Sequence, residues 1–423
     1  MRWYSRIAAA AFAALLQACA TAPAVAPETS ASVAEARAPV TVLVSIDGFR
    51  PDYLTRGITP NLSRLAAQGA SGAMHPSFPS KTFPNHWTLV TGLRPDRHGI
   101  VANKMEDPAR PDEVFTMASD DPFWWNAAEP IWNDAEAAGI RTATMFWPGS
   151  NVAIGGHKER PRDWEVIGGH RPADWAQFNQ AISDEQRVNG ILDWLRRPAA
   201  IRPRFVTLYF DLVDSAGHDV GPDGAGMRDA LVEVDAQIGA LVAGLAELRQ
   251  PANLVIVSDH GMAATSSDRV IVLGDLLAEA DYHLVESGPF LTLAPMPGRE
   301  AVVEKALLRP HDHMQCWRKG EIPARFHYGA NPRVPPILCL AETGWLINLK
   351  APAKPFAAGT HGYDDQSPEM AALFIAQGPA FRAARLAPFD NVDVYPLLRD
   401  LIGLPAKPGV DGTDAPFRSA MAR

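Results

Sequence analysis

The sequence predicts an α/β fold, namely a mainly parallel β-sheet covered by helices on both faces, with a small inserted lobe. Short, nearly continuous apolar runs alternate along the chain with stretches of helical patterning. This alternation is typical of parallel strands that are buried on both faces. The 423 residues are 47% hydrophobic and 21% charged, which is an ordinary globular composition and enough to bury a large core.

The elements follow one another in a regular order. The first strand is predicted at 40–46, before a helix that Thr59 caps and that begins at Pro60, because proline suits the first helical turn. Further strands are predicted at 204–210, 254–258 and 371–375, and further helices at 226–248 and 392–402. The stretch 281–355 breaks the rhythm, because it is rich in Pro, Arg and His. It is therefore predicted to be the inserted lobe.

The N-terminal residues resemble an export signal. Two arginines precede an apolar run at 7–16 that is too short to span a bilayer. Residues 1–18 are therefore predicted to be a signal peptide of the lipoprotein type. Residues 19–39, rich in Ala, Pro, Ser and Thr, are predicted to be a flexible spacer before the domain at 40–415.

The three cysteines have separate predicted roles. Ala18 before Cys19 resembles a bacterial lipobox, which predicts a lipid on Cys19 and a place in the periplasm or envelope. An ordinary cleavage site at 20–26 is the alternative. Cys316 and Cys339 then remain, and one leftover pair in an exported chain suggests a disulfide, with two buried free thiols as the alternative.

The charge balance limits the partners of the chain. With 39 basic and 48 acidic side chains, the net charge is −9, so no basic surface for wrapping a nucleic-acid duplex is expected. A small substrate that carries phosphate must instead meet a local positive charge, for instance a metal ion.

Acidic and histidine side chains follow the predicted strands or lie close to them. They are Asp47, Asp214, His218, Asp259, His260 and His361. Ligands lie beyond the carboxyl ends of parallel strands, so these side chains are expected to meet in one crevice. Nitrogen and oxygen ligands of this kind suit zinc, and six are too many for one tetrahedral ion, which favours two metals. Asp259 and His260 face one metal only if the chain turns, which Gly261 permits. Taken singly, each residue is also explained as a cap, a solvated turn or a loop hydrogen-bonder.

A nucleophile is expected at the start of a helix. Pro84 and Gly92 mark a helix start and end, which places Thr82 at or beside its N-terminus. Free backbone N–H groups and the helix dipole favour an oxyanion there. The alternative is that Thr82 only caps the helix.

Seven ordered segments resemble the nucleotide pyrophosphatase/phosphodiesterase family of the alkaline phosphatase superfamily. They are 45–50, 79–86, 99–105, 146–150, 214–218, 258–262 and 359–362. The resemblance covers residues 40–412 and implies an alkaline-phosphatase-like fold that binds two zinc ions. It assigns one zinc to Asp47, Thr82, Asp259 and His260. It assigns the other to Asp214, His218 and His361.

The resemblance also assigns roles toward the substrate. It implies that Thr82 is the nucleophile and that Asn103 donates to a phosphoryl oxygen. It suggests Phe83 as a wall on which a nucleobase stacks. Lys81 and Lys104 are either phosphate contacts or solvated surface charges. The tryptophan-rich spans 123–125 and 163–175 are either pocket walls or packing. The segment 311–316 is interpreted as a surface loop beside the disulfide.

The implied reaction cleaves a nucleotide phosphodiester or phosphoanhydride bond through a covalent threonine intermediate and releases a nucleoside 5′-monophosphate. A phosphomonoester, phosphonate or lipid-headgroup hydrolase of the same superfamily is the second hypothesis. A non-catalytic zinc-binding envelope protein is the third.

Overall fold

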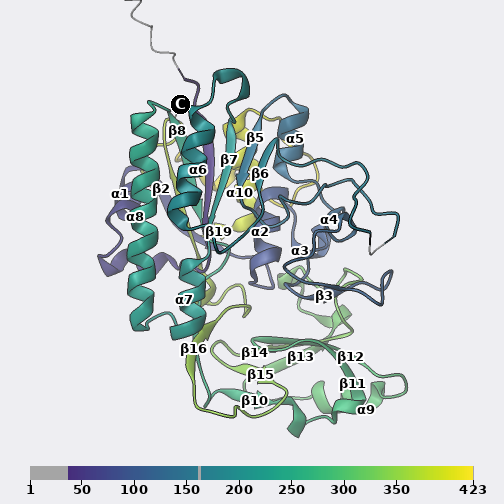
Figure 1. The fold of residues 1–423 in the computed structure, drawn as a ribbon. Coiled ribbons are helices and arrows are strands. Elements are labelled where there is room, and N and C mark those ends of the chain that lie inside the picture. The colour runs from purple at the N-terminus through teal and green to yellow at the C-terminus, as the bar shows by residue number, and fades with distance from the viewer. Residues whose placement is uncertain (1–36, 161–162, 423) are drawn as a thin grey trace, which may run out of the picture. The chain divides into compact units, whose positions relative to one another are not determined.

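The computed structural model describes residues 37–160 and 163–422 (Figure 1). The predicted signal peptide at 1–18, the candidate lipidation site Cys19 and the predicted spacer as far as residue 36 lie outside the described residues.

The main element is a nine-stranded sheet. In spatial order its strands are β18 (Ala384–Arg385), β2 (Ala70–His75), β17 (Ala372–Gln377), β8 (Ala252–Val257), β1 (Val40–Ile46), β7 (Phe205–Phe210), β5 (Thr142–Met145) and β6 (Asp174–Ala176), and β19 (Phe389–Asp390) pairs with β2. The five strands from β8 to β6 are parallel to one another. The mainly parallel sheet predicted from the alternating pattern is therefore confirmed.

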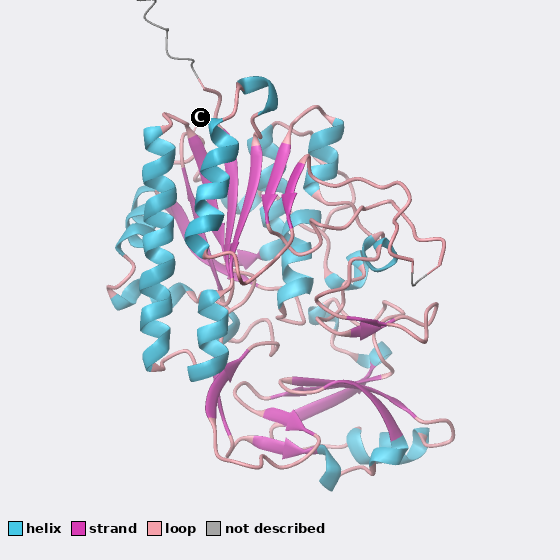
Figure 2. Ribbon diagram, viewed as in Figure 1, coloured by secondary structure: helices cyan, strands magenta, loops and turns pink. Residues whose placement is uncertain are grey.

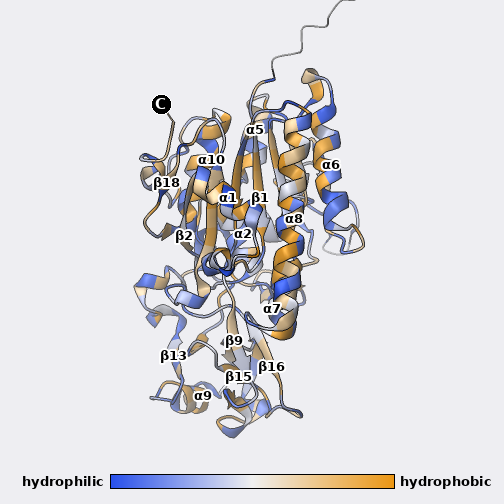
Figure 3. Cartoon of the chain, turned by 90° about the vertical axis from the view of Figure 1, so that its left-hand side faces the viewer, coloured by the Kyte–Doolittle hydropathy of each residue, from blue (hydrophilic) through white to orange (hydrophobic). Residues whose placement is uncertain are grey.

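Helices cover both faces of this sheet (Figure 2). One face carries α1 (Pro60–Gln68), α6 (Asp184–Arg196) and α8 (Ala225–Glu247), and the other carries α2 (Thr82–Thr91), α5 (Ile131–Ala137) and α10 (Val394–Ile402). Successive residues of β1 point to opposite faces, so Val42 and Val44 pack in one core and Leu43 in the other. Both faces of the strand are therefore hydrophobic, and the central strands carry mostly the orange of hydrophobic residues in Figure 3.

Shorter elements fill the connections. The segment between α2 and α5 holds α3 (Pro95–His98), β3 (Met105–Glu106), β4 (Val114–Phe115) and α4 (Pro122–Trp125), and α7 (Leu212–Val220) follows β7. Within the described residues, no helix combines the length and the apolar character that crossing a membrane requires.

Strand β17 departs from the parallel pattern that its apolar run suggests. It is antiparallel to both β8 and β2. A parallel connection needs a crossover that returns the chain to the opposite edge of the sheet. Between β8 and β17 the chain instead passes through a lobe and returns at the edge it left, so β17 begins where β8 ends.

The predicted cap of α1 is wrong. Thr59 stands at the N-cap but makes no side-chain cap hydrogen bond. Asp235 of α8 caps the helix instead. Its two carboxylate oxygens accept hydrogen bonds from the backbone N–H groups of Asn61, at 3.1 Å, and Leu62, at 2.8 Å. A carboxylate from a neighbouring helix satisfies the same free N–H groups.

A second, four-stranded antiparallel sheet lies within the stretch 281–355. Its strands are β11 (Tyr282–Glu286), β12 (Phe290–Pro295), β14 (Ile337–Ala341) and β13 (Met314–Arg318), and α9 (Glu300–Leu307), β10 (Val270–Val272) and β15 (Leu346–Asn348) accompany it. Cys316 and Cys339 are directly paired across β13 and β14 and form a disulfide.

A two-stranded stem connects this lobe to the sheet (Figure 1). It consists of β9 (Ala263–Ser266) and β16 (Ala357–Thr360), which pair antiparallel over four residues each. The outgoing strand of the stem begins three residues after His260, and the returning strand ends just before His361.

Candidate active site

The predicted acidic and histidine residues meet at one edge of the sheet. Asp47 directly follows β1, and Asp259 and His260 follow β8, so all three lie at the carboxyl ends of neighbouring parallel strands. His361 reaches the same edge because β17 is antiparallel. Asp214 and His218 lie one turn apart on α7, a helix that the sequence interpretation missed although i,i+4 spacing indicates one.

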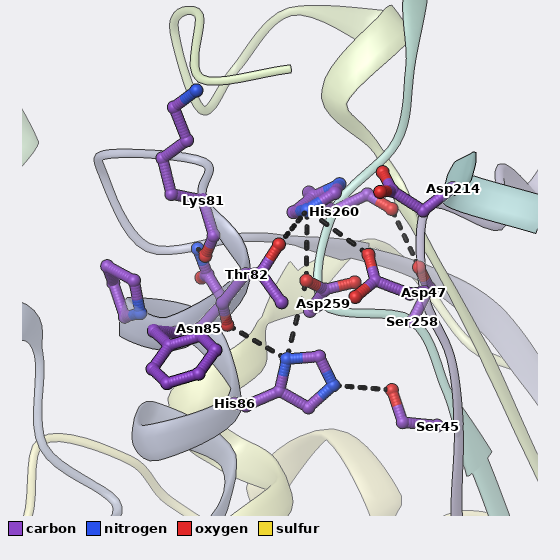
Figure 4. Close-up of polar contacts among 12 residues, drawn as sticks. Ser45, Asp47, Lys81, Thr82, Asn85, His86, Asp214, Ser258, Asp259 and His260 are labelled. Atoms are coloured by element: carbon purple, nitrogen blue, oxygen red, sulfur yellow. Dashed lines mark hydrogen bonds and ion pairs between the residues drawn. The ribbon is translucent and has the colours of Figure 1, made fainter. Parts of the chain in front are cut away.

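Three side chains surround the imidazole of His260 (Figure 4). Its Nε2 atom lies 2.9 Å from Asp259 Oδ2, 3.4 Å from Asp47 Oδ1 and 3.3 Å from Thr82 Oγ1. All four residues are buried. They are the residues that the family resemblance assigns to one zinc.

The other predicted ligands lie beside this group. Asp214 is 3.4 Å from His218 Nε2 and 3.7 Å from His361 Nε2. The rings of His361 and His260 stack with their centroids 3.5 Å apart. Compact groups able to hold a metal are formed by Asp47, Asp259 and His260 and by Asp214, His260 and His361. His260 thus belongs to both groups. His218 belongs to neither, and 41% of its side chain is exposed. The division of ligands between two ions stays a prediction.

The histidines are oriented as metal ligands require. In each ring Nδ1 contacts a backbone carbonyl oxygen, at Gly359 for His218 (3.0 Å), at Gly261 for His260 (2.9 Å) and at Ser80 for His361 (2.8 Å). A carbonyl oxygen only accepts, so Nδ1 carries the proton in each contact. The lone pair of each Nε2 is then left for a metal, as is usual for zinc-binding histidines.

The carboxylates also fit a cation. Asp47 Oδ1, Asp214 Oδ1 and Asp259 Oδ2 are buried without a hydrogen-bond partner. Burial and the neighbouring carboxylates Asp259 and Asp214 raise the pKa of Asp47 well above its ordinary value. Buried anionic oxygens without donors are costly unless a cation compensates them. The donor set therefore fits divalent metal ions such as Zn²⁺.

Thr82 is the first residue of α2, and Lys81 is its N-cap. The alternative that Thr82 merely caps the helix is therefore wrong. Asn103 lies beside it, because Asn103 Oδ1 accepts from the Phe83 N–H at 2.9 Å. This contact uses the oxygen of the amide and leaves its NH₂ group free to donate. Both Thr82 and Asn103 line the adjoining cavity.

Two residues that the sequence analysis did not assign to the site, Tyr209 and His86, contact its predicted residues. The Tyr209 hydroxyl donates to Asp47 Oδ2 at 2.7 Å, which turns the other oxygen toward His260. His86 lies one turn after Thr82, where its Nδ1 is 2.8 Å from the Thr82 carbonyl and 3.4 Å from Asp259 Oδ2. Its Nε2 is 2.8 Å from Ser45 Oγ. The sequence carries no specific signal for either residue, because a buried hydroxyl or imidazole is as often a packing residue.

Gly261 has a different role from the one expected. Asp259 and His260 already lie beyond the end of β8, so no turn at Gly261 is needed to bring them together. A Cβ atom at Gly261 would lie 2.1 Å from the Glu369 carbonyl oxygen. Glycine is required because another backbone passes close by.

A cavity of about 480 Å³ opens over Thr82. Its aromatic walls come from Phe83, Trp125, Phe146, Phe178 and Tyr209. The residues that line it include no lysine and no arginine. Of the tryptophan-rich spans, Trp125 lines this cavity, whereas Trp164 does not and is 91% exposed.

Some predicted residues lie outside this cavity. The Lys81 side chain points away from Thr82 (Figure 4), and Lys104 is exposed. Their phosphate contacts stay predictions. His313 stacks on Trp345 in the lobe and belongs to neither compact metal group among the described residues.

Comparison with known proteins gives consistent matches. The sequence pattern of a family described as type I phosphodiesterase / nucleotide pyrophosphatase matches residues 41–364. A bis(5′-adenosyl)-triphosphatase, enpp4, of Xenopus laevis is 39% identical over 376 residues, which are 88% of this chain and 79% of that protein. Ectonucleotide pyrophosphatase/phosphodiesterase family member 3 of Bos taurus is 34% identical over 387 residues, which cover 88% of this chain and 43% of that protein.

Solved structures agree. Human ectonucleotide pyrophosphatase/phosphodiesterase 5 superposes with a TM-score of 0.83 and 33% identity, covering 91% of this chain and 100% of that one. An inactive threonine-to-alanine variant of the murine protein, in complex with AMP, has the same TM-score and coverage at 34% identity. The alkaline-phosphatase-like fold implied by the family resemblance is therefore confirmed.

Proposed function

The chain belongs to the type I phosphodiesterase / nucleotide pyrophosphatase family, and we propose that it is a two-zinc hydrolase of nucleotide phosphodiester or phosphoanhydride bonds that works through a covalent intermediate on Thr82. One observation carries the proposal. Thr82 Oγ1 lies between the buried carboxylate–histidine cluster and an aromatic cavity of nucleotide size. The names of the relatives, which describe pyrophosphatases and phosphodiesterases, point to the same reaction.

The residues proposed to hold the two ions are Asp47, Thr82, Asp259 and His260 on one side and Asp214, His218 and His361 on the other. When bound, Zn²⁺ supplies Lewis acidity that lowers the pKa of the Thr82 hydroxyl and offsets the charge of the phosphate. The buried oxygens without donors and the Nε2 atoms that carry no proton support this assignment.

In the first step, Thr82 Oγ attacks phosphorus in line and its proton passes to solvent. A bond forms between Oγ and phosphorus, while the bond from phosphorus to the leaving oxygen breaks. Water then attacks the threonine-linked phosphorus, the Oγ bond breaks and Thr82 regains a proton. The product that carries the nucleoside is a 5′-monophosphate.

Asn103 is proposed to stabilise the transition state. Because its oxygen is engaged by the Phe83 N–H, its NH₂ group is oriented as a donor to a non-bridging phosphoryl oxygen. Loss of such a donor typically raises the barrier by about 3 kcal/mol. The aromatic walls, Phe83 among them, are proposed to stack on the nucleobase.

The proposed location is outside the cytoplasm, in the bacterial periplasm or envelope, with a lipid tether on Cys19. The basic and apolar start of the chain and the lipobox-like Ala18–Cys19 support it. The mass of the mature N-terminal peptide distinguishes a lipidated Cys19 from ordinary cleavage.

Replacing the nucleophile tests the reaction. In Thr82→Ala, hydrolysis of the p-nitrophenyl ester of thymidine 5′-monophosphate should fall at least about 10³-fold, because the attacking oxygen is lost. Zinc content should stay near that of the wild type, because Asp47, Asp259 and His260 remain. Thr82→Ser is the matched control and should keep part of the rate.

Two outcomes would contradict the proposal. A wild-type rate in Thr82→Ala removes Thr82 from the mechanism. A preference for p-nitrophenyl phosphate over the thymidylate ester, or for glycerophosphodiesters over nucleotides, favours the second hypothesis. No turnover of any of these by the zinc-loaded protein favours the non-catalytic one.

A further inference from the structure

Lys81 lies between the nucleophile and the lobe. It immediately precedes Thr82, and its side chain is only 11% exposed. Its stem rests on the backbone beside a candidate ligand, because a Cβ atom at Gly362 would lie 2.7 Å from Lys81 Cε. The ammonium group is 5.7 Å from the centroid of the Phe290 ring.

The partner of Lys81 is a carboxylate of the lobe. Lys81 Nζ lies 3.9 Å from Glu286 Oε1. Glu286 is the last residue of β11, and the pairing of β11 with β12 shifts register between Leu284 and Glu286. Such a bulge redirects a side chain. The Glu286 side chain is 13% exposed, and its Oε2 atom is buried without a hydrogen-bond partner.

This pair matters because the cavity has so little positive charge of its own. No lysine or arginine is among the residues that line it, and Lys104 is exposed to solvent. Lys81 does not line the cavity, but it precedes the lining residue Thr82 and packs beside Gly362, which follows the lining residue His361, so its charge acts on a leaving group through space. Glu286 already neutralises it.

We propose that Glu286 determines leaving-group specificity: by pairing with Lys81 it disfavours leaving groups that carry several negative charges, such as pyrophosphate, relative to those that carry few. This inference rests on the proposed hydrolysis of nucleotides. Its physical basis is the repulsion between a largely buried carboxylate and an anionic leaving group, which solvent screens only in part.

Two substrates that share one nucleotide test the proposal. The p-nitrophenyl ester of thymidine 5′-monophosphate and thymidine 5′-triphosphate transfer the same thymidylyl group but release nitrophenolate or pyrophosphate. In Glu286→Gln the ratio of kcat/KM for the triphosphate to kcat/KM for the aryl ester should rise about tenfold, since the negative charge that neutralises Lys81 is removed. The aryl ester should change less than about twofold.

The control is Glu304→Gln. Glu304 also belongs to the lobe, but it pairs with Arg318 and not with Lys81, so the ratio should not move. A ratio unchanged in Glu286→Gln, or an equal gain for both substrates, overturns the proposal. Absence of thymidylate hydrolysis in the wild type would instead contradict the proposed function itself.

A second variant keeps the test decisive if Glu286→Gln does not fold. In Lys81→Gln the Glu286 carboxylate is left without its cation, so the same ratio should fall about tenfold. An unchanged ratio in a folded Lys81→Gln protein with wild-type zinc content also overturns the proposal.

Discussion

The hydroxyl of Tyr209 decides which oxygen of Asp47 is available to a metal. It donates to Oδ2, so Oδ1, buried without a hydrogen-bond partner, faces His260. The ring of the same residue lines the cavity. Tyr209 thus contacts the candidate metal centre through its hydroxyl and lines the cavity with its ring. Its hydroxyl orients the Asp47 carboxylate toward the metal position.

Tyr209→Phe should therefore weaken zinc binding. Loss of a hydrogen bond that orients a ligand typically costs 10- to 100-fold in metal affinity, which competition with a chelator measures directly. Tyr53→Phe is the matched control, because the Tyr53 hydroxyl is buried without a hydrogen-bond partner. Equal zinc affinity in both variants would count against an orienting role for Tyr209.

Residues differ in how far the sequence predicts them. Asp47 and Asp259 could be found because each stands where an apolar strand ends, and that position has a physical meaning in a parallel sheet. Tyr209 and His86 could not, because a buried hydroxyl or imidazole is as often a packing residue. Their partners, Asp47 and Asp259, are distant in the chain.

At the scale of elements, the longest regular runs were predicted well, whereas the helix α6 (Asp184–Arg196) was not predicted. Strand β1 has the predicted bounds, and α8 differs by one residue at each end, because their apolar patterns are long and regular. The direction of β17 was not predictable from its composition. An apolar strand is buried equally well in either direction. The connection through the lobe determines that β17 runs antiparallel to β8.

The Cys316–Cys339 disulfide should stabilise the lobe. It joins residues 23 positions apart on adjacent strands, and a loop of that length contributes about 3 kcal/mol to the free energy of unfolding. The double variant Cys316→Ser/Cys339→Ser should unfold at lower urea concentration.

The kcat/KM of that double variant for the thymidylate ester should stay within about twofold of the wild type at 25 °C, since neither cysteine lines the cavity. Wild-type protein treated with a reductant serves as the comparison. Identical urea midpoints for the oxidised protein and the variant would speak against a stabilising disulfide.

At the scale of the whole molecule, the fold concentrates negative charge. Asp47, Asp214 and Asp259 meet at one edge of the sheet, and no lysine or arginine of residues 37–160 and 163–422 lies within hydrogen-bonding reach of them. Repulsion among these groups opposes folding, and a bound cation relieves it. Metal binding and stability are therefore expected to be coupled.

Zinc should raise the unfolding temperature of a chelator-treated protein. At a free concentration of about 1,000 times Kd, binding to the folded state contributes about 4 kcal/mol. Asp259→Asn should lose most of this gain, whereas Glu304→Gln should keep it. The same unfolding temperature with and without zinc, in protein verified to be metal-free, would contradict the metal assignment.

The relation between the lobe and the site is the part that sequence patterns alone could not give. Lys81 and Glu286 are separated by 204 residues in the chain. No sequence pattern near Glu286 therefore signals that it pairs with Lys81. Only the return of the chain through the lobe brings the two together.

The stem of β9 and β16 makes the lobe modular. Ala263 pairs with Thr360 and Ser266 with Ala357, so the four pairs fix the spacing between His260 and His361 whatever chain lies between them. Evolution can lengthen, shorten or replace the sequence beyond the stem while the ligands keep their places. Selectivity for the leaving group and the capacity to bind metal can then diverge separately, and chimeras joined at this stem should exchange one without the other.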